Sequence, residues 1–339
     1  RLWCAVHSSP SRHFGQPRVA AQQRGNMTGK FKGFVSLCLR FAVSAALLAF
    51  LFSRIDTAAT LKLLKDARME YVGGALLIFI AIHMVLIVRW MVVIRGLDLD
   101  LPFINVIRFF FIGLFGNLFL PSAIGGDIIK AAGLCARRDD KQKVVASILL
   151  DRLSGFAGMV LLALVAFIFG FRYVEGPLVL SAIAVMGAGL FVLGAILFHE
   201  GLYSFFCRIF LFWPNFREKV MQMHYDIAFL RGRKGVLARA ILLSCAAQIL
   251  LAVVFWCLAK ALYQDVLFFY LLIFTPMTCV ASSLPSVGGL GFREAGLEYL
   301  LVGIGVPAGI GVSIGLLDFV FMVIIGVAGY FIFLMTRSR

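Results

Sequence analysis

The chain has 339 residues, of which 62% are hydrophobic and 14% are charged. Soluble domains contain roughly 45–50% apolar and about 25% charged residues, so this composition excludes a soluble globular protein. The apolar residues occur in runs long enough for helices of about 20 residues, the length that crosses a bilayer. The sequence therefore predicts an all-α integral membrane protein.

The formal net charge of +15 could also indicate nucleic-acid binding. The lysines and arginines, however, gather in short segments between the apolar runs, as the positive-inside rule predicts for cytoplasmic loops. No basic stripe interleaved with aromatic residues occurs, so no nucleic-acid partner is expected. The seven cysteines form no CxxC motif and do not cluster with histidines or carboxylates. No disulfide framework, metal site or cofactor is therefore expected.

The N-terminal part of the chain divides into a polar stretch and an apolar run. We expect residues 1–26 to be a disordered tail or translated upstream sequence, with Met27 as the natural start. Residues 27–335 are expected to form a single transmembrane domain, followed by a basic cytoplasmic tail at 336–339. The run at 34–53 is longer than a signal-peptide core and lacks a small-residue cleavage site, so it predicts an uncleaved first helix.

Seven further apolar segments predict helices in the membrane. They fall at about 71–95, 103–120, 144–170, 178–198, 236–259, 266–283 and 314–335, and a shorter glycine-rich segment spans 297–312. Basic residues concentrate in 121–143, in 199–239 and at the C-terminus. If these basic segments and both termini face the cytoplasm of a bacterial inner membrane, 103–120 and 266–283 cannot cross. We therefore predict that each is an arm of a re-entrant hairpin, and that the two hairpins enter from opposite sides.

The two predicted hairpins contain similar motifs. The first reads Leu120-Pro121-Ser122 and then Gly125-Gly126-Asp127; the second reads Leu284-Pro285-Ser286 and then Gly288-Gly289-Leu290-Gly291. A helix with an early aspartate, Asp151 or Asp318, follows each motif. The chain thus divides into halves at about 34–170 and 178–335, each with three spanning helices and one re-entrant hairpin. Three crossings are an odd number, so we expect an inverted repeat, as in many secondary transporters. The alternative is that a common turn motif occurs twice by chance.

The residues of these motifs suit interrupted helices. Pro121 and Pro285 are expected to end a helix, because proline lacks the N–H and clashes with the preceding turn. The glycines that follow permit a tight reversal and the close approach of another chain or a ligand; they are Gly125, Gly126, Gly288, Gly289 and Gly291. Asn117, just before the first break, is expected to satisfy freed backbone groups. Such backbone is tolerated at membrane depth only where protein buries it or where it lines a watery cavity.

Charged side chains inside the predicted membrane segments are candidates for headgroup binding or the substrate path. A charge at the helix centre costs at least about 2.5–3.5 kcal/mol, so its presence points to a function. The candidates are Asp127, Lys130, Asp151, Arg152, Arg293 and Glu294. Asp151 and Arg152 are adjacent and project in different directions, so each needs a partner elsewhere. The expected partners are Asp127 or Lys130 for one, and Glu294 or Asp318 for the other. The alternative is a structural ion pair that locks the halves together.

Three other polar residues lie in the segment at 71–95. His83 is expected to be a hydrogen-bonded packing residue. Arg89 and Arg95 are expected to extend along the helix toward the cytoplasmic interface, because long basic side chains place their charge in water.

Together these residues resemble the lysylphosphatidylglycerol synthase transmembrane (flippase-like) family. The resemblance covers about 34–335 and rests on Asn117, Leu120-Pro121-Ser122, Gly125-Gly126-Asp127 and Lys130, on Ala146-Ser147 and Asp151-Arg152-Leu153-Ser154-Gly155, and on Ser283-Leu284-Pro285-Ser286 with Gly288-Gly289-Leu290-Gly291-Phe292-Arg293-Glu294. In bifunctional relatives this module is joined to a cytosolic aminoacyl-transferase and moves lysyl-lipid between leaflets. The resemblance therefore implies lipid translocation, and without the synthase portion no aminoacyl transfer is expected. Lys130 stands where the family usually has a bulkier basic residue, so charge is kept but bidentate headgroup binding is lost.

We expect a flippase-like transporter of a polar or isoprenoid-type lipid that alternately exposes a cavity between its halves. Three basic residues would attract the headgroup, and three acidic ones would balance charge or carry a coupling proton; they are Lys130, Arg152 and Arg293, and Asp127, Asp151 and Glu294. The alternatives are a non-transporting partner of a lipid- or glycan-synthesis enzyme, docking through 199–239, and a secondary transporter of a soluble ion. No nucleophile–base constellation or nucleotide loop occurs, so an enzyme is not expected.

Overall fold

The structure is a computed structural model that describes residues 64–119, 125–136, 140–170, 177–198, 233–283 and 289–337, together with positions 49, 62, 201 and 286. These residues form helices and no strand. In chain order the helices are α3 (Met69–Gly96), α4 (Phe103–Phe119), α5 (Gly125–Cys135), α6 (Lys141–Gly170), α7 (Pro177–Phe198), α10 (Lys234–Ala261), α11 (Phe268–Ser282), α12 (Phe292–Val302) and α13 (Ile310–Arg337). The predicted tail at 1–26 lies outside the described residues, as do most of 34–53 and of 199–239.

Four of the described helices, α3, α6, α10 and α13, are long and apolar enough to cross a membrane. At 1.5 Å per residue a helix of 28 residues is about 42 Å long, which exceeds the roughly 30 Å hydrocarbon core. Helices α4 and α11 are apolar but shorter, and α7 has no charged residue in its 22 residues. The protein is therefore an all-helical, multi-pass membrane protein.

Helices α3 and α10 form the centre of the bundle and run antiparallel. At one end, the backbone N–H of Arg68, just before α3, donates to the carbonyl of Ala261, the last residue of α10 (3.0 Å). At the other end, the guanidinium of Arg233, just before α10, donates to the carbonyl of Gly96, the last residue of α3 (3.2 Å). Gly96 also packs directly on Val236, with no room for a Cβ atom. The start of each helix therefore lies beside the end of the other.

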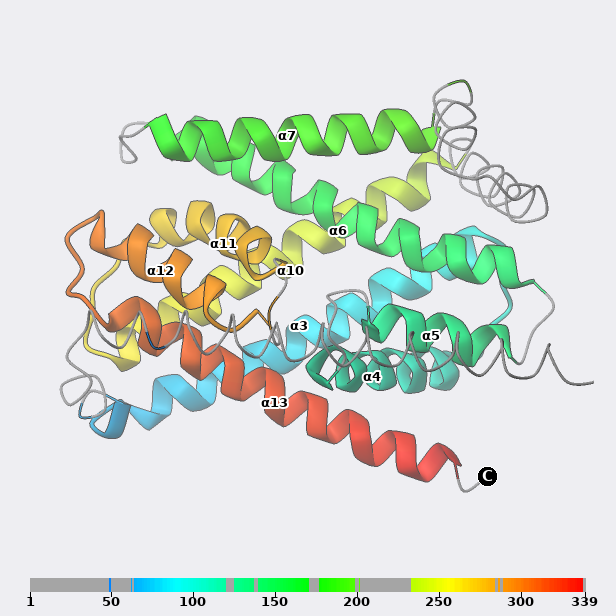
Figure 1. The fold of residues 1–339 in the computed structure, drawn as a ribbon, viewed down its shortest axis with the longest axis horizontal. Helices are drawn as coiled ribbons and strands as arrows, with labels where there is room; N and C mark the ends of the chain where they lie inside the picture. The colour runs from blue at the N-terminus through cyan, green and yellow to red at the C-terminus, as the bar shows by residue number, and fades with distance from the viewer. Residues whose placement is uncertain are drawn as a thin grey trace, which may run out of the picture.

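Each central helix is followed by a pair of short helices, α4–α5 after α3 and α11–α12 after α10. Because α3 and α10 are antiparallel, these two pairs lie at opposite ends of the bundle, α4 and α5 at the right and α11 and α12 at the left of Figure 1. The next long helix then packs against the pair of the other half: α6 contacts α11, and α13 contacts α4. The halves are thus interlocked.

Apolar side chains fill the interior in two buried clusters, one around each short helix pair. One joins α3, α10, α11 and α13 through residues such as Phe79, Phe255 and Phe274. The other joins α3, α4, α5 and α6 through residues such as Trp90 and Phe110. Large apolar side chains also cover the outside; Leu77 and Phe191 are 70% and 77% exposed. Helices that are apolar on every side suit a lipid solvent.

The glycine-rich segment at 297–312 comprises the end of α12, a loop, and the start of α13. Gly305 and Gly309 take positive φ angles of 86° and 93° in the loop, a conformation that glycine adopts without strain. The carboxylate of Glu298 accepts hydrogen bonds from the backbone N–H groups of Gly309 (2.6 Å) and Val312 (3.2 Å). It thereby satisfies donors at the start of α13 that have no partner within the helix, and α13 begins at Ile310 instead of 314.

Candidate functional site

Helices α4 and α5 approach each other closely because two glycines face each other. A Cβ atom on Gly126 would collide with the carbonyl oxygen of Gly113 and with the side chain of Asn117. The Asn117 amide oxygen accepts a hydrogen bond from the backbone N–H of Gly126 (2.8 Å), one of the donors left free at a helix start. Gly125 and Gly126 therefore lie in the first turn of α5 and do not form a chain reversal themselves. Pro121 lies outside the described residues.

Lys130 of α5 is buried and faces α3 and α4. Its aliphatic stem packs on Gly113, which has no side chain to exclude it. Its Nζ lies 4.9 Å from the centre of the Trp90 ring and 4.8 Å from that of Phe110. It also lies 3.5 Å from the Oδ1 of Asp127. Cation–π contacts of this kind are strongest in desolvated sites, so two aromatic rings and one carboxylate stabilise the buried ammonium.

Asp127 pairs with Arg152, which is one of the expected pairings. The Arg152 Nε donates to the Asp127 Oδ2 at 2.5 Å and links α6 to α5. The two side chains differ in exposure, 51% for Arg152 and 6% for Asp127. Arg152 is therefore the member of this pair that a ligand could reach.

Asp151 pairs with Arg89, and the expectation that Arg89 extends toward the interface is wrong. The Arg89 Nε and Nη2 donate to the two carboxylate oxygens of Asp151 at 2.8 and 3.0 Å, and its Nη1 donates to the Ser244 hydroxyl at 3.1 Å. Gly155 leaves room for this guanidinium. Arg89 lies seven residues before the end of α3, or about 10 Å along the axis. At that depth the Asp151 carboxylate, which accepts two hydrogen bonds, is nearer to the guanidinium than the water of the interface. Arg95, in the last turn of α3, is exposed.

A second group of charges lies at the other end of the bundle. The Arg293 Nη2 and Nε donate to Glu294 Oε1 at 2.7 and 3.2 Å, and its Nη1 donates to Asp318 Oδ2 at 2.8 Å. Glu294 is fully buried, and its Oε2 accepts from the backbone N–H of Gly291 at 2.6 Å. Gly315, one turn before Asp318, leaves the space that the Glu294 side chain fills. Neither Glu294 nor Asp318 contacts Asp151 or Arg152, so that part of the expected pairing is wrong.

The backbone before this second group turns sharply. Gly289 and Gly291 have φ angles of 81° and 94°, which L-residues with side chains rarely adopt. Gly291 is the N-cap of α12. Pro285 and Gly288, which belong to the same predicted hinge, lie outside the described residues.

We call Arg89, Asp127, Lys130, Asp151 and Arg152 the first cluster, and Arg293, Glu294 and Asp318 the second cluster. The first cluster has three cations and two carboxylates, and the second has one cation and two carboxylates. The sequence proposed six of these eight residues as sites. Of the other two, Arg89 was assigned to the interface and Asp318 was named only as a pairing partner. Asp318 follows the second motif as Asp151 follows the first, and this correspondence could have identified it as a site residue. Among the described residues no group of three His, Cys, Asp or Glu side chains could hold a metal ion.

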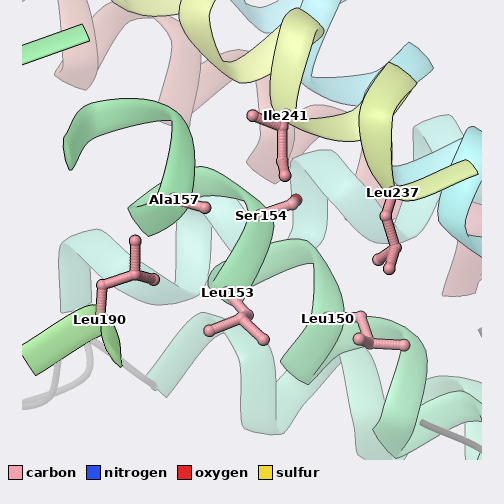
Figure 2. A pocket seen from close by; sticks show the side chains of 7 residues that line it. All are labelled: Leu150, Leu153, Ser154, Ala157, Leu190, Leu237 and Ile241. Atoms are coloured by element: carbon pink, nitrogen blue, oxygen red, sulfur yellow. The ribbon is translucent and has the colours of Figure 1, made fainter. Parts of the chain in front are cut away.

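An apolar cavity of about 230 Å³ lies beside α6 (Figure 2). It lies between α6, α7 and α10 and is lined by Leu150, Leu153, Ser154, Ala157, Leu190, Leu237 and Ile241. The Ser154 hydroxyl is engaged, since it donates to the carbonyl of Asp151 (2.9 Å). Two of the lining residues, Leu150 and Leu153, flank Asp151 and Arg152 in the sequence of α6.

These features define a class of protein, a multi-pass helical membrane protein with two interrupted helix pairs and buried charges at each. The chain matches the family described as "Lysylphosphatidylglycerol synthase TM region" over residues 37–329 and belongs to that family. It is also similar to the UPF0104 membrane protein PH1989 of Pyrococcus horikoshii. The two are 25% identical over 291 residues, which cover 76% of this chain and 84% of the relative.

Proposed function

We propose that this protein moves a membrane lipid between the leaflets of a bacterial inner membrane, as a flippase-like transporter and not as an enzyme. The observation that carries the proposal is the sequence of α6, where the buried Asp151 and the half-exposed Arg152 stand between Leu150 and Leu153, two residues that line an apolar cavity. A lipid has a charged headgroup and an apolar tail, and this site offers a surface for each. The family name, with its lysyl-lipid, supports the same substrate class.

The headgroup would bind at Arg152. The first cluster has one more cation than carboxylates, and Arg152 is its half-exposed member. Its guanidinium can bind a phosphate through two parallel hydrogen bonds, which a lysine cannot do. The lipid tail would occupy the cavity between α6, α7 and α10. We therefore assign an anionic phosphate headgroup to the substrate.

We further propose that the two halves form an inverted repeat with re-entrant helix pairs. Three observations support this: α3 and α10 are antiparallel, the short helix pairs lie at opposite ends (Figure 1), and α6 and α13 each contact the pair of the other half. The two clusters would then face opposite membrane surfaces, with both termini in the cytoplasm. Rocking of one half against the other would expose the cavity to each leaflet in turn.

The decisive experiment is leaflet exchange of fluorescent phosphatidylglycerol, phosphatidylethanolamine and lysyl-phosphatidylglycerol in proteoliposomes. The wild type is compared with Arg152→Gln and with Arg95→Gln, which removes an exposed arginine from the end of α3. We expect exchange of phosphatidylglycerol, the anionic lipid of the three, by the wild type and the Arg95→Gln variant, and a loss of about tenfold in Arg152→Gln, equivalent to about 1.4 kcal/mol. Equal rates in Arg152→Gln and wild type would remove Arg152 from the lipid path.

The same assay tests the second candidate function. If the wild type exchanges none of these lipids, the translocation proposal is overturned. The protein would then act as a membrane partner of a lipid- or glycan-synthesis enzyme, and charge neutralisation in 199–239 should abolish that association.

A further inference from the structure

The second cluster combines an excess charge with an unused hydrogen-bond acceptor. Both oxygens of Glu294 and the Oδ2 of Asp318 accept hydrogen bonds. The Asp318 Oδ1 is buried and has no hydrogen-bond partner among the described residues. Arg293 neutralises one of the two carboxylates, and no described residue supplies a counter-ion for the remaining negative charge. Buried charges are normally paired, so the second cluster needs one further positive charge as its ligand.

We propose that the missing ligand is a proton, and that Asp318 is a proton-binding site. A proton on Oδ1 would neutralise the cluster while leaving every hydrogen bond donated by Arg293 in place. It would be taken from a hydronium ion, leaving water, and be returned to a water molecule on release. No other reactant is needed. The proton site itself does not depend on lipid transport. Its role, to couple lipid movement to a proton gradient, rests on the proposed function.

The geometry favours a proton over a metal cation. Ions such as Ca²⁺ and Mg²⁺ require six or more oxygen ligands, whereas the described part of the cluster has a single free oxygen. It also favours Asp318 over Glu294 as the carrier. The Glu294 Oε2 accepts from the N-cap of α12 and its Oε1 accepts two bonds from Arg293, so protonation there would disrupt existing hydrogen bonds.

The surroundings of Asp318 are otherwise uncharged. Of the helices packed against α13, α12 contributes Arg293 and Glu294, and α11 contributes Cys279, whose thiol interacts with Asp318 and Arg293. The described residues of α3, α4 and α10 bring no charged partner to Asp318. The Cys279 sulfur shares weak hydrogen bonds with Gln248 of α10 (3.8 and 3.9 Å). Among the described residues, Arg293 is the cation with which a proton would compete for this carboxylate.

The first cluster provides the contrast within the same molecule. Asp151 stands at the position that corresponds to Asp318, near the start of the long helix after the hairpin. Both of its oxygens accept from Arg89, and the first cluster has excess positive charge. Asp151 therefore has no carboxylate oxygen without a hydrogen-bond donor. The two halves would then differ in role, the first binding an anionic headgroup and the second binding a proton.

The test is infrared difference spectroscopy of the full chain reconstituted in lipid and stepped between acid and alkaline pH. We expect a carbonyl band of a protonated carboxylic acid that shifts in D₂O. The high-frequency band of a buried carboxyl should be lost in Asp318→Asn, shifted in Asp318→Glu, and kept in Asp98→Asn, which removes only the lower-frequency absorption of an exposed carboxyl. Asparagine imitates the neutral carboxyl, so Asp318→Asn should elute as a folded protein, and Asp318→Glu provides a variant that keeps the acid.

A wild type without this band, or an Asp318→Asn variant that keeps it, would overturn the proposal. The spectrum does not require lipid movement, so a band without exchange would refute only the transport, and exchange without a band would refute only the proton site. In vesicles that exchange lipid, an imposed pH gradient should change the rate in the wild type and not in Asp318→Asn. Equal responses of the two proteins to the gradient would contradict the coupling.

Discussion

The guanidinium of Arg89 binds both carboxylate oxygens of Asp151, at 2.8 and 3.0 Å. The two residues are 62 positions apart in sequence, and their contact joins two spanning helices, α3 and α6. Only 8% of Arg89 and 6% of Asp151 is exposed. Burying both charges is costly, and their attraction offsets that cost only in good geometry. This pair therefore belongs to the structural core of the first cluster, whereas the Arg152 side chain beside it is half-exposed.

Removal of one partner of this pair should destabilise the protein more than removal of both. We expect Arg89→Leu to lower the free energy of unfolding by about 3–5 kcal/mol, because it leaves Asp151 buried and unpaired. Arg89→Leu combined with Asp151→Leu should recover part of that loss. Thermal unfolding in detergent, followed by tryptophan fluorescence, measures the difference. If the effects of the two single substitutions simply add, the pair is not coupled.

A side chain at Gly126 should force α4 and α5 apart. Gly126→Ala places its methyl group against Gly113 and Asn117, and overpacking of this kind costs about 1–3 kcal/mol. Gly187 of α7 has no heavy atom within 4 Å of a built Cβ, so Gly187→Ala should be neutral or stabilising by roughly 0.5–1 kcal/mol. Melting temperatures of the two variants test this contrast. Equal shifts would mean that the α4–α5 contact is looser than described.

Single cysteines in a cysteine-free chain should reveal the inverted arrangement. The loops before α4 and before α6 carry Asp100 and Asp140, and those before α11 and before α13 carry Asp265 and Ala308; all four are exposed. We expect cysteines at 100 and 140 to react with an impermeant maleimide on one side of sealed vesicles. Those at 265 and 308 should react only on the other side. Labelling of all four from the same side would exclude the inverted repeat.

The ion pair between Asp98 and Arg233 should make stability depend on pH. Hydrogen bonds from Arg233 (2.8 Å each) hold the pKa of Asp98 below its usual value. A carboxyl with a lowered folded pKa stabilises the protein above its unfolded pKa, and that contribution is lost as pH falls through the folded value. The wild type should therefore melt slightly above Asp98→Asn at neutral pH and together with it in acid.

Asp98→Asn is a conservative variant, because Asp98 has a φ angle of 52° and asparagine tolerates that conformation. The pair is exposed, so the difference between wild type and variant should also shrink at high salt. If the melting temperatures of wild type and Asp98→Asn still differ in acid, the difference does not arise from the ion pair.

Filling the apolar cavity should impair transport and leave the fold intact. Ala157 points into the cavity from α6 (Figure 2), and Ala157→Phe would occupy much of the space proposed for the lipid tail. We expect slower lipid exchange with an unchanged or higher melting temperature. Ala188 of α7 is exposed and lines no part of the cavity, so Ala188→Phe is the size-matched control. Similar losses in both variants would argue against a lipid in this cavity.

The sequence predicted the parts of the fold that depend on local hydropathy and backbone chemistry. The spans at 71–95, 144–170, 236–259 and 314–335 correspond to α3, α6, α10 and α13, because a bilayer imposes a minimum apolar length. The family was also recognisable from the motifs around Gly125 and Gly289, and a match over 37–329 confirms it. The start of α13 was misplaced because its cap, Glu298, lies in another helix.

What the sequence alone determined is therefore the class of protein, the family, and six of the eight residues in the two clusters, since charged residues in apolar runs stand out without any structure. Only the tertiary structure decided which charges are neutralised. Arg89 and Arg95 are six residues apart on α3, yet one is buried against Asp151 and the other is exposed. Asp151 and Asp318 occupy matching positions, yet only Asp318 keeps a free oxygen. The physical reason is that the rotation of a helix and the helices packed beside it decide whether a buried charge finds its partner, and hydropathy along the chain records neither.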